Sequence, residues 1–189
     1  MNIIPTDLKD VYILEPIVHG DHRGWFMESW SQRTFEEHGL HYQFVQDNHS
    51  YSAVKGTLRG LHCQKGEAAQ AKLVRCTRGA IFDVVLDLRP DSPSCGAWHG
   101  VELSEENGRM LYLPEGCAHG YQTLRPDTEM HYMTSAFYAP ASATGVRFDD
   151  PAFGIAWPLP VSEISEQDRN WPLMRRIPSD AAQPQRLSA

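Results

Sequence analysis

The sequence predicts an all-β fold, built as an antiparallel sandwich or barrel. Apolar residues recur at every second position in "KLVRCT" (72–77) and "AIFDVVLDL" (80–88), which is the period of a strand. Such segments are separated by turns rich in Gly, Pro and Asn, such as "NG" at 107–108 and "PEG" at 114–116. Strands do not alternate regularly with helical segments, so a doubly wound parallel sheet is not expected.

The elements follow in chain order. Only "SQRTFEEHG" (31–39) is predicted as a helix, with Ser31 as its N-cap and Gly39 as its C-terminal stop. Two hairpins are then expected. The first joins residues 72–77 to 80–88 through the "RG" bend, and the second joins Val101 and Leu103 to "MLYL" (110–113) through the "NG" turn.

The composition bounds the classes of function. A chain of 189 residues, 41% of them hydrophobic, suffices for one domain; we expect it over residues 1–173, followed by a polar tail over 174–189. The net charge of −7 argues against nucleic-acid or anionic-membrane binding.

The location and the redox state can also be predicted. No apolar run approaches the roughly 18 residues of a membrane span, and "MNIIPTDLKD" lacks the features of a signal peptide. A cytoplasmic protein is therefore expected. The cysteines form no C-x-x-C pair and are expected to be reduced thiols rather than zinc ligands or disulfides: they are Cys63, Cys76, Cys95 and Cys117.

The segment "TLRGLHCQ" (57–64) places polar groups in a predicted strand. Alternation puts Arg59 and His62 on opposite faces, so a bend at Gly60 is needed for them to converge. Taken singly, such residues are more often a satisfied core histidine and a solvated edge arginine. However, Lys72 and Tyr132 are also polar residues within apolar predicted strands, and His119 is a polar residue in a turn bounded by glycine. Burying each without partners costs roughly 1 to 3 kcal/mol, so together they indicate a lined cavity.

Seven stretches carry a resemblance over most of residues 1–172. In order they are "GDHRGWFMESW", "FVQDNHS", "LRGLHCQ", "QAKLVRCTRGAIFDVVLDLR", "PEGCAHGY", "FDDPAFGIAWP" and "SEQDRNWP". Together they resemble the dTDP-4-dehydrorhamnose 3,5-epimerase family. The resemblance implies a cupin-type jelly roll and a homodimer whose N-terminal strands cross between subunits. It also implies epimerisation, without metal or cofactor, of a 4-keto-6-deoxy sugar linked to a nucleoside diphosphate.

The resemblance gives catalytic roles to four residues. His62 corresponds to the base, Asp168 to the carboxylate that hydrogen-bonds it, Tyr132 to the opposing acid and Lys72 to the cation beside the enolate. These groups suit the chemistry, because inversion beside a ketone needs a base, an acid and a cation. Each has a structural alternative. Asp168 has capping-box spacing from Ser165, Tyr132 could pack in the core, and Lys72 could be a surface lysine.

The resemblance also implies the contacts to the substrate. Arginines suit the diphosphate because they form bidentate, charge-assisted hydrogen bonds. The implied contacts are Arg23 and Arg59 for the diphosphate, Phe26 and Glu28 for the nucleoside, Gln46, Asp47 and Asn48 beside them, His119 and Lys72 for the sugar, and Tyr138 stacking on the base. Tyr138 also has a structural alternative, ordinary packing within "AFYAP".

Some positions depart from the family pattern. Met133 and Gln167 stand where the family commonly has lysine, and Ala143 and Thr144 where it commonly has a glutamate. These departures leave open the exact nucleotide and sugar, and whether one or both carbons are inverted. Two further classes also stay open: a metal-dependent cupin using His62, Gln64 and His119, and a sugar-nucleotide binding module without catalysis.

Overall fold

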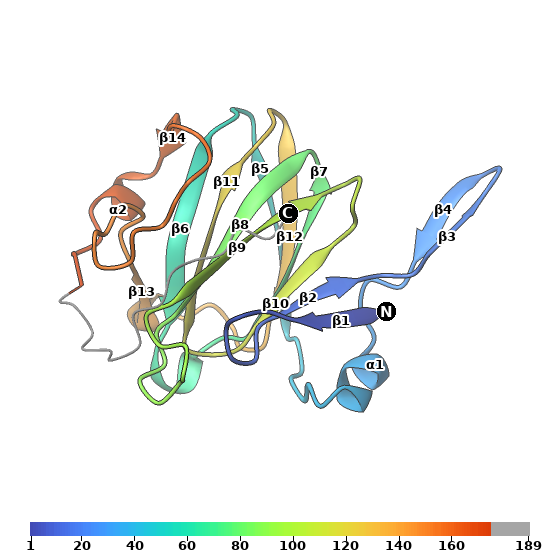
Figure 1. Cartoon of the computed structure of the whole chain (residues 1–189), viewed down its shortest axis with the longest axis horizontal. Coiled ribbons are helices and arrows are strands. Elements are labelled where there is room, and N and C mark those ends of the chain that lie inside the picture. Colours follow the sequence, from blue (N-terminus) through green and yellow to red (C-terminus); the bar gives the residue numbers. More distant parts are fainter. Residues whose placement is uncertain (175–189) are drawn as a thin grey trace.

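The computed structural model describes residues 1–174, which form two antiparallel sheets packed face to face (Figure 1). The first sheet has the order β1-β2-β10-β7-β12-β5. Its strands are β1 (Asn2–Pro5), β2 (Tyr12–Glu15), β5 (Gln46–Ser52), β7 (Lys72–Arg78), β10 (Met110–Leu113) and β12 (Thr128–Thr134). All but one of the predicted tail residues 174–189 lie outside the described residues, and the domain boundary at 173 stays a prediction.

The second sheet has the order β13-β6-β11-β8-β9, with the short β14 parallel to β6. Its strands are β6 (Thr57–Gln64), β8 (Ala80–Asp87), β9 (Trp98–Ser104), β11 (Cys117–Thr123), β13 (Ala143–Gly145) and β14 (Glu163–Ile164). The arrangement is a cupin-type jelly roll, and the predicted all-β fold is confirmed. Short helical turns accompany it: η1 (Gly66–Ala68), η2 (Pro140–Ser142) and α2 (Glu166–Arg169).

Both predicted hairpins are wrong. β7 pairs with β10 and β12 in the first sheet, whereas β8 pairs with β9 and β11 in the second. β9 and β10 likewise lie in different sheets. Alternation identifies a strand but not its partner. Because every residue of β8 is buried, the backbone N–H and C=O groups along both of its edges need a partner strand. The chain crosses from the first sheet to the second at Gly79, whose φ is +74°.

The core has one layer between the sheets and another outside the second sheet, and a third cluster packs Phe35 against Leu73 and Tyr112 of the first sheet. Val74 and Leu111 of the first sheet pack with Ile81 and Val85 of β8 in the inner layer. On the outer face of β8, Phe82, Val84 and Leu86 are covered by a C-terminal stretch that includes Phe153 and Trp157. Residues that follow the last long strand therefore close one side of the molecule.

Two N-terminal elements lie beside the sheets. Helix α1 (Gln32–Glu37) is confirmed: Ser31 Oγ accepts the Thr34 N–H at 3.4 Å, and Gly39 has a φ of +78°. Strands β3 (Val18–Asp21) and β4 (Gly24–Met27) form a separate hairpin that projects from the body (Figure 1). No helix within residues 1–174 is long and apolar enough to span a membrane.

Candidate active site

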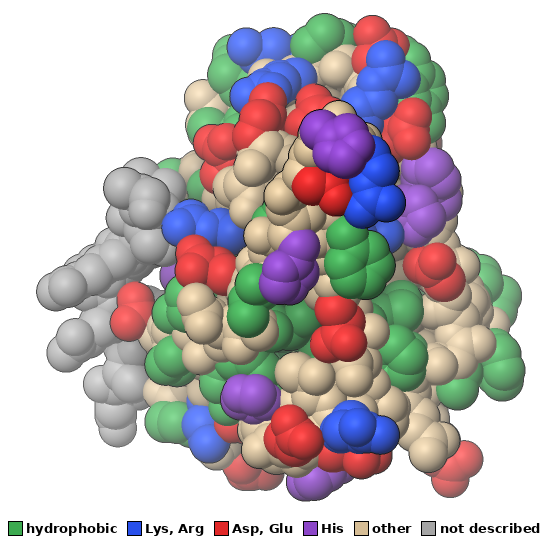
Figure 2. All heavy atoms as spheres, turned by 90° about the vertical axis from the view of Figure 1, so that its right-hand side faces the viewer, with side chains coloured by type: hydrophobic (Ala, Val, Ile, Leu, Met, Phe, Trp, Pro, Cys, Tyr) green, Lys and Arg blue, Asp and Glu red, His purple; other side chains and the backbone are tan. Residues whose placement is uncertain are grey.

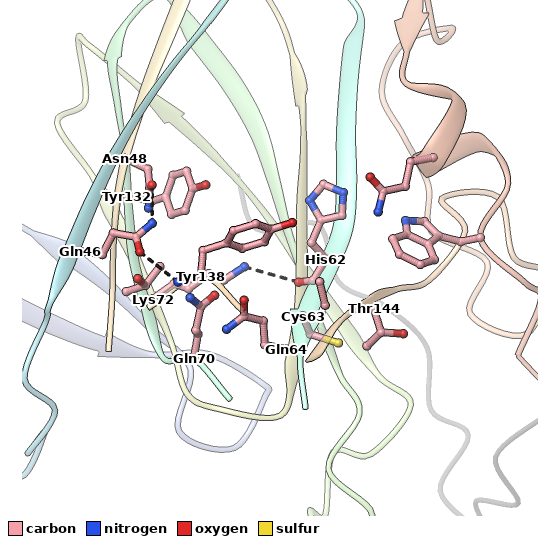
Figure 3. Close-up of a pocket in the computed structure, with 14 residues that line it drawn as sticks. Gln46, Asn48, His62, Cys63, Gln64, Gln70, Lys72, Tyr132, Tyr138 and Thr144 are labelled. Atoms are coloured by element: carbon pink, nitrogen blue, oxygen red, sulfur yellow. Dashed lines mark hydrogen bonds between the residues drawn. The ribbon is translucent and has the colours of Figure 1, made fainter. Parts of the chain in front are cut away.

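A cavity of about 370 Å³ opens between the two sheets (Figure 3). Both sheets and the loops at one end contribute to it, and most of the residues that line it have polar side chains. The lining residues are Gln46, Asn48, His62, Cys63, Gln64, Gln70, Lys72, Tyr132, Thr134, Tyr138, Ala143, Thr144, Gln167 and Trp171.

A bulge in β6 turns Arg59 and His62 to the same face. On the neighbouring β11, His119 lies opposite His62, and Tyr121 lies opposite Arg59. Because positions 119 and 121 share one face of their strand, their partners share it too. Gly60, with a φ of +123°, absorbs the irregularity, and a β-carbon there would lie 2.5 Å from the Gly120 Cα. The bend predicted at this glycine is confirmed.

The His62 imidazole is oriented by Asp168. Its Nε2 lies 2.5 Å from Asp168 Oδ1, the Gly60 N–H donates to Oδ2 at 3.0 Å, and the Trp171 indole donates to Oδ1 at 3.3 Å. Burial alone would raise the pKa of Asp168, but these hydrogen bonds outweigh it and hold the pKa below its ordinary value. An ionised carboxylate only accepts, so Nε2 carries the proton and Nδ1 is left with a lone pair.

Asp168 both belongs to a capped helical turn and hydrogen-bonds His62, and it uses different atoms for the two roles. Ser165 Oγ accepts the backbone N–H of Asp168 at 3.1 Å, which caps α2. The carboxylate, by contrast, is directed at His62 and Gly60. The cap therefore fixes the backbone from which the carboxylate reaches the imidazole.

Lys72 is a buried cation at the cavity, not a surface lysine. Only 6% of the residue is exposed, and its Nζ donates to the backbone carbonyl of His62 at 3.5 Å. Desolvation lowers its pKa from 10.5 to about 8, against the opposing influence of Cys63 and Asp83. A weakly compensated ammonium at this position would be stabilised by a negatively charged oxygen.

Two tyrosines line the cavity from different elements. Tyr132 extends from β12 of the first sheet, so it lies across the cavity from His62 on β6 of the second (Figure 3). Burial raises the pKa of Tyr132, which keeps the phenol protonated near neutral pH. Tyr138 follows β12, and its backbone N–H donates to Gln46 Oε1 at 3.0 Å.

Three predicted contact residues on the two large sheets lie outside this cavity. Arg59 lines an adjoining groove together with His62 and Asp168. His119 is buried beside His62 on the neighbouring strand, where its Nε2 lies 2.8 Å from Asp83 Oδ1. Asp47 is exposed on the outer face of β5, because alternation sends it away from its neighbours Gln46 and Asn48. Their roles towards the substrate stay predictions.

The remaining predicted contacts lie on or just after the projecting hairpin. Arg23 pairs with Asp21 at the turn, Phe26 is 70% exposed on β4, and Glu28 accepts from Thr34 Oγ1 at 3.2 Å. None of them lines the cavity of its own chain, so their proposed contacts to the nucleotide stay predictions.

Sequence reasoning did not single out several lining residues, namely Gln70, Thr134 and Trp171. Strand alternation could have found Thr134, which is two positions after Tyr132 on the same face. Trp171 stands in the quoted "NWP" stretch, but nothing in that pattern shows that its indole bonds to Asp168. Gln70 precedes β7 in a loop and carries no recognisable pattern.

The arrangement of these side chains favours acid–base chemistry over a metal-dependent cupin. Within residues 1–174, no group of three or more His, Cys, Asp or Glu side chains is arranged to hold a metal ion. Gln64, one of the ligands considered for a metal cupin, already uses its amide in three hydrogen bonds. A jelly roll that presents a histidine–aspartate pair, a buried lysine and a facing tyrosine around one cavity is suited to acid–base chemistry on a small molecule.

Comparison with known proteins identifies the family. The family model described as dTDP-4-dehydrorhamnose 3,5-epimerase matches residues 5–176. The chain belongs to this family of isomerases, as its resemblance implied.

Individual relatives agree with the match over nearly the whole chain. The dTDP-4-dehydrorhamnose 3,5-epimerase of Salmonella typhimurium is 51% identical, over 92% of this chain and 96% of the relative. The crystal structure of the Bacillus anthracis enzyme, with TDP and PPi bound, is 44% identical with a TM-score of 0.89, covering 92% of this chain and 99% of that one. The Legionella pneumophila dTDP-6-deoxy-D-glucose-3,5-epimerase, in complex with dTDP-4-keto-L-rhamnose, is 42% identical with a TM-score of 0.84, covering 88% and 89%.

Proposed function

We propose that the protein inverts C-3 and C-5 of a dTDP-linked 4-keto-6-deoxyhexose, forming dTDP-4-dehydrorhamnose. The observation that carries the proposal is the placement of the His62 imidazole, whose Nε2 is held by Asp168, across the cavity from Tyr132. A base and an acid on opposite faces of one bound sugar are what inversion of a carbon requires. The names of the relatives support this substrate and both positions.

The reaction is proposed to proceed through an enolate. Nδ1 of His62 removes the proton from the carbon beside the C-4 ketone, and the carboxylate of Asp168 stabilises the resulting imidazolium. The negative charge that develops on the ketone oxygen is stabilised by the Lys72 ammonium. Tyr132 then delivers a proton to the opposite face of the carbon, after which the phenolate regains a proton from solvent and His62 releases one. The same steps act at the second carbon.

The nucleotide is proposed to occupy the groove beside the cavity. Arg59 and His62 both line this groove, and His62 also lines the cavity, so the two spaces meet at the imidazole. Arg59 is exposed there, with Nη2 donating to the Tyr51 carbonyl at 3.0 Å. A diphosphate bound by this guanidinium would leave the attached sugar beside His62.

The projecting hairpin is proposed to complete the site of a second subunit. Trp25 is 67% exposed and Phe26 is 70% exposed, which is unusual for aromatic side chains of a monomer. Figure 2 views the molecule from the hairpin side, where apolar side chains, histidines and charges of both signs are interspersed. In a homodimer Arg23, Phe26 and Glu28 would contact the nucleotide bound to the partner. The cytoplasmic location stays a prediction from the sequence.

The function is tested by incubation with dTDP-4-keto-6-deoxyglucose in deuterated water, with NMR detection at C-3 and C-5. We expect deuterium at both carbons, inversion at both, and no loss of rate after treatment with EDTA. Exchange at C-3 alone would show a single epimerase, and absence of exchange would refute the proposal.

The division of labour between base and acid is tested with Tyr132→Phe. The enolate still forms, so His62 can return a deuteron to the face from which it took the proton. Exchange should therefore persist while inversion is lost. An unchanged yield of the epimer would show that another group is the acid.

The role of the hairpin is tested by mixing two inactive variants. His62→Ala lacks the base, and the combined variant Arg23→Ala/Phe26→Ala lacks the hairpin contacts. A mixed dimer has one site with both defects and one site with neither, so activity should reappear after the subunits exchange. Mixtures without activity, or a variant that sediments as a monomer at full activity, would contradict the exchanged hairpin.

A further inference from the structure

The segment that carries Tyr138 is held by side chains rather than by a neighbouring strand. Strand β12 ends at Thr134 and η2 begins at Pro140, so residues 136–139 belong to neither. Their backbone groups nevertheless have partners: Gln70 Nε2 donates to the Ala136 carbonyl at 2.8 Å, and Gln64 Nε2 donates to the Phe137 carbonyl at 3.1 Å. Gln46 Oε1 accepts the Tyr138 N–H at 3.0 Å.

Gln64 makes the most extensive of these contacts. Besides the Phe137 carbonyl, its Nε2 donates to the Ala68 carbonyl at 2.6 Å, and its Oε1 accepts the Ala139 N–H at 2.7 Å. Two carbonyls need the NH₂ end and one N–H needs the oxygen, so the amide has one possible orientation and both its N–H groups are used. The residue is 5% exposed. Loss of this amide would remove the hydrogen-bond partner of three partly buried backbone groups.

The ring of Tyr138 depends on this anchorage. Tyr138 is 62% exposed, so packing contributes little to its position. It nevertheless lines the cavity, and Figure 3 shows the ring pointing into the cavity with its hydroxyl on the side of His62. A poorly packed ring is held in place only as well as the backbone that carries it.

We propose that Gln64 and Gln70 are positioning residues, which fix Tyr138 at the mouth of the cavity by binding the backbone of residues 136–139. Gln64 is two positions after His62 on the same face of β6. One strand therefore carries both the candidate base and the side chain that holds residues 136–139. The proposal rests on the proposed function only for its kinetic consequence. The anchorage itself can be measured without turnover.

The anchorage is tested by hydrogen–deuterium exchange of the peptide that spans residues 136–139 in Gln64→Leu and Gln70→Leu. Leucine keeps the bulk of the side chain and removes the hydrogen bonds. We expect faster exchange in this peptide, with Gln64→Leu giving the larger change because Thr134 Oγ1 also donates to the Ala136 carbonyl. Exchange indistinguishable from the wild type in both variants would overturn the proposal, whether or not the enzyme epimerises sugars.

Gln122→Leu provides the matched control. Gln122 is also buried, and its amide clamps another backbone segment, donating to the Leu159 carbonyl at 2.9 Å and accepting the Leu159 N–H at 3.1 Å. It does not line the cavity. We expect this variant to lose stability, to exchange normally over residues 136–139 and to keep the wild-type KM.

The effect on substrate binding is tested by a double-mutant cycle. If Tyr138 contributes binding in the ground state, Gln64→Leu should raise KM about tenfold and change kcat less than about threefold. In a Tyr138→Ala background the same change should have almost no further effect, because the positioned ring is gone. Additive effects would show that Gln64 acts independently of Tyr138 and would overturn the proposal. If Gln64→Leu does not fold, Gln70→Leu in the same cycle gives the deciding result.

Discussion

The two histidine–aspartate pairs of the second sheet are neighbours, yet they differ in access. His119 lies directly opposite His62 across β11 and β6. The His62 side chain is 46% exposed and bonds to Asp168 from the C-terminal segment, whereas the His119 side chain is 6% exposed and bonds to Asp83 of β8. An imidazole must reach its substrate to exchange a proton with it. The pair of His62 and Asp168 is therefore suited to catalysis, whereas the buried pair of His119 and Asp83 is suited to stabilising the sheet.

The carboxylates of the two pairs differ in how many hydrogen bonds they accept. Asp168 accepts hydrogen bonds from three donors. Asp83 has its Oδ1 bonded to His119, while its buried Oδ2 has no hydrogen-bond partner among the described residues. A carboxylate saturated with donors stays ionised and holds one tautomer of its histidine. This difference can be tested by perturbing each pair.

The largest effect is expected from His62→Ala. Removal of the base should lower kcat by about 10³-fold, while calorimetry should find dTDP binding nearly unchanged because the nucleotide contacts remain. Folding should survive, since the side chain is half exposed. Substantial turnover by this variant would show that another residue is the base.

Lys72→Met should lower kcat by about 10²-fold, through loss of the charge beside the enolate. It should also raise the free energy of unfolding at pH 7, by on the order of 1 to 3 kcal/mol, because a desolvated ammonium is replaced by an apolar chain. Urea unfolding and steady-state kinetics measure the two changes. A variant that loses stability as well as activity would contradict the inference that the buried Lys72 ammonium lowers the free energy of unfolding.

The pH dependence of the wild type gives an independent check on Lys72. Its pKa of about 8 in the folded protein is below the ordinary value of 10.5. Activity should therefore fall as the pH rises through about 8. In the window from about 8 to 10.5 the unfolded chain binds more protons, so this group makes stability rise with pH. An alkaline limb of the rate profile that stays in place in Lys72→Arg would assign the titration to another group.

His119→Asn should affect stability more than turnover. Shortening the side chain withdraws the donor from buried Asp83, which should cost about 3 kcal/mol in the free energy of unfolding. The kcat of the folded fraction should fall less than about tenfold, far less than for His62→Ala. A loss of kcat equal to that of His62→Ala, at unchanged stability, would abolish the distinction between the two pairs.

The smallest effect is expected from Trp171→Phe. This change removes the indole donor from Asp168 Oδ1 and keeps most of the ring. One fewer donor should raise the pKa of Asp168, so the acid limb of the rate profile should move to higher pH and kcat should fall about threefold. An acid limb at its wild-type position would show that Gly60 and His62 suffice to hold the carboxylate.

The sequence predicts some of these features because they follow from local rules. Alternation identifies the strands, and the need to bring Arg59 and His62 to one face predicts the irregularity at Gly60. The same rules predict wrong partners for β7 and β9, because pairing is decided by the global topology. Only the family resemblance predicts the pairing of Asp168 with His62. The sequence does not predict the anchorage by Gln64 and Gln70, because hydrogen bonds to distant backbone carbonyls leave no pattern in a sequence.

The C-terminal closure of the second sheet has a consequence for folding. His62 and Asp168 are 106 residues apart, and they meet only after β14 and α2 have docked against β6. Topologies dominated by such distant pairings fold slowly, because the chain must close long loops before it gains the contacts. In a refolding experiment, the circular-dichroism signal of the sheets should thus recover before catalysis does. A chain arrested before its last segment docks would be largely folded by that signal and still inactive.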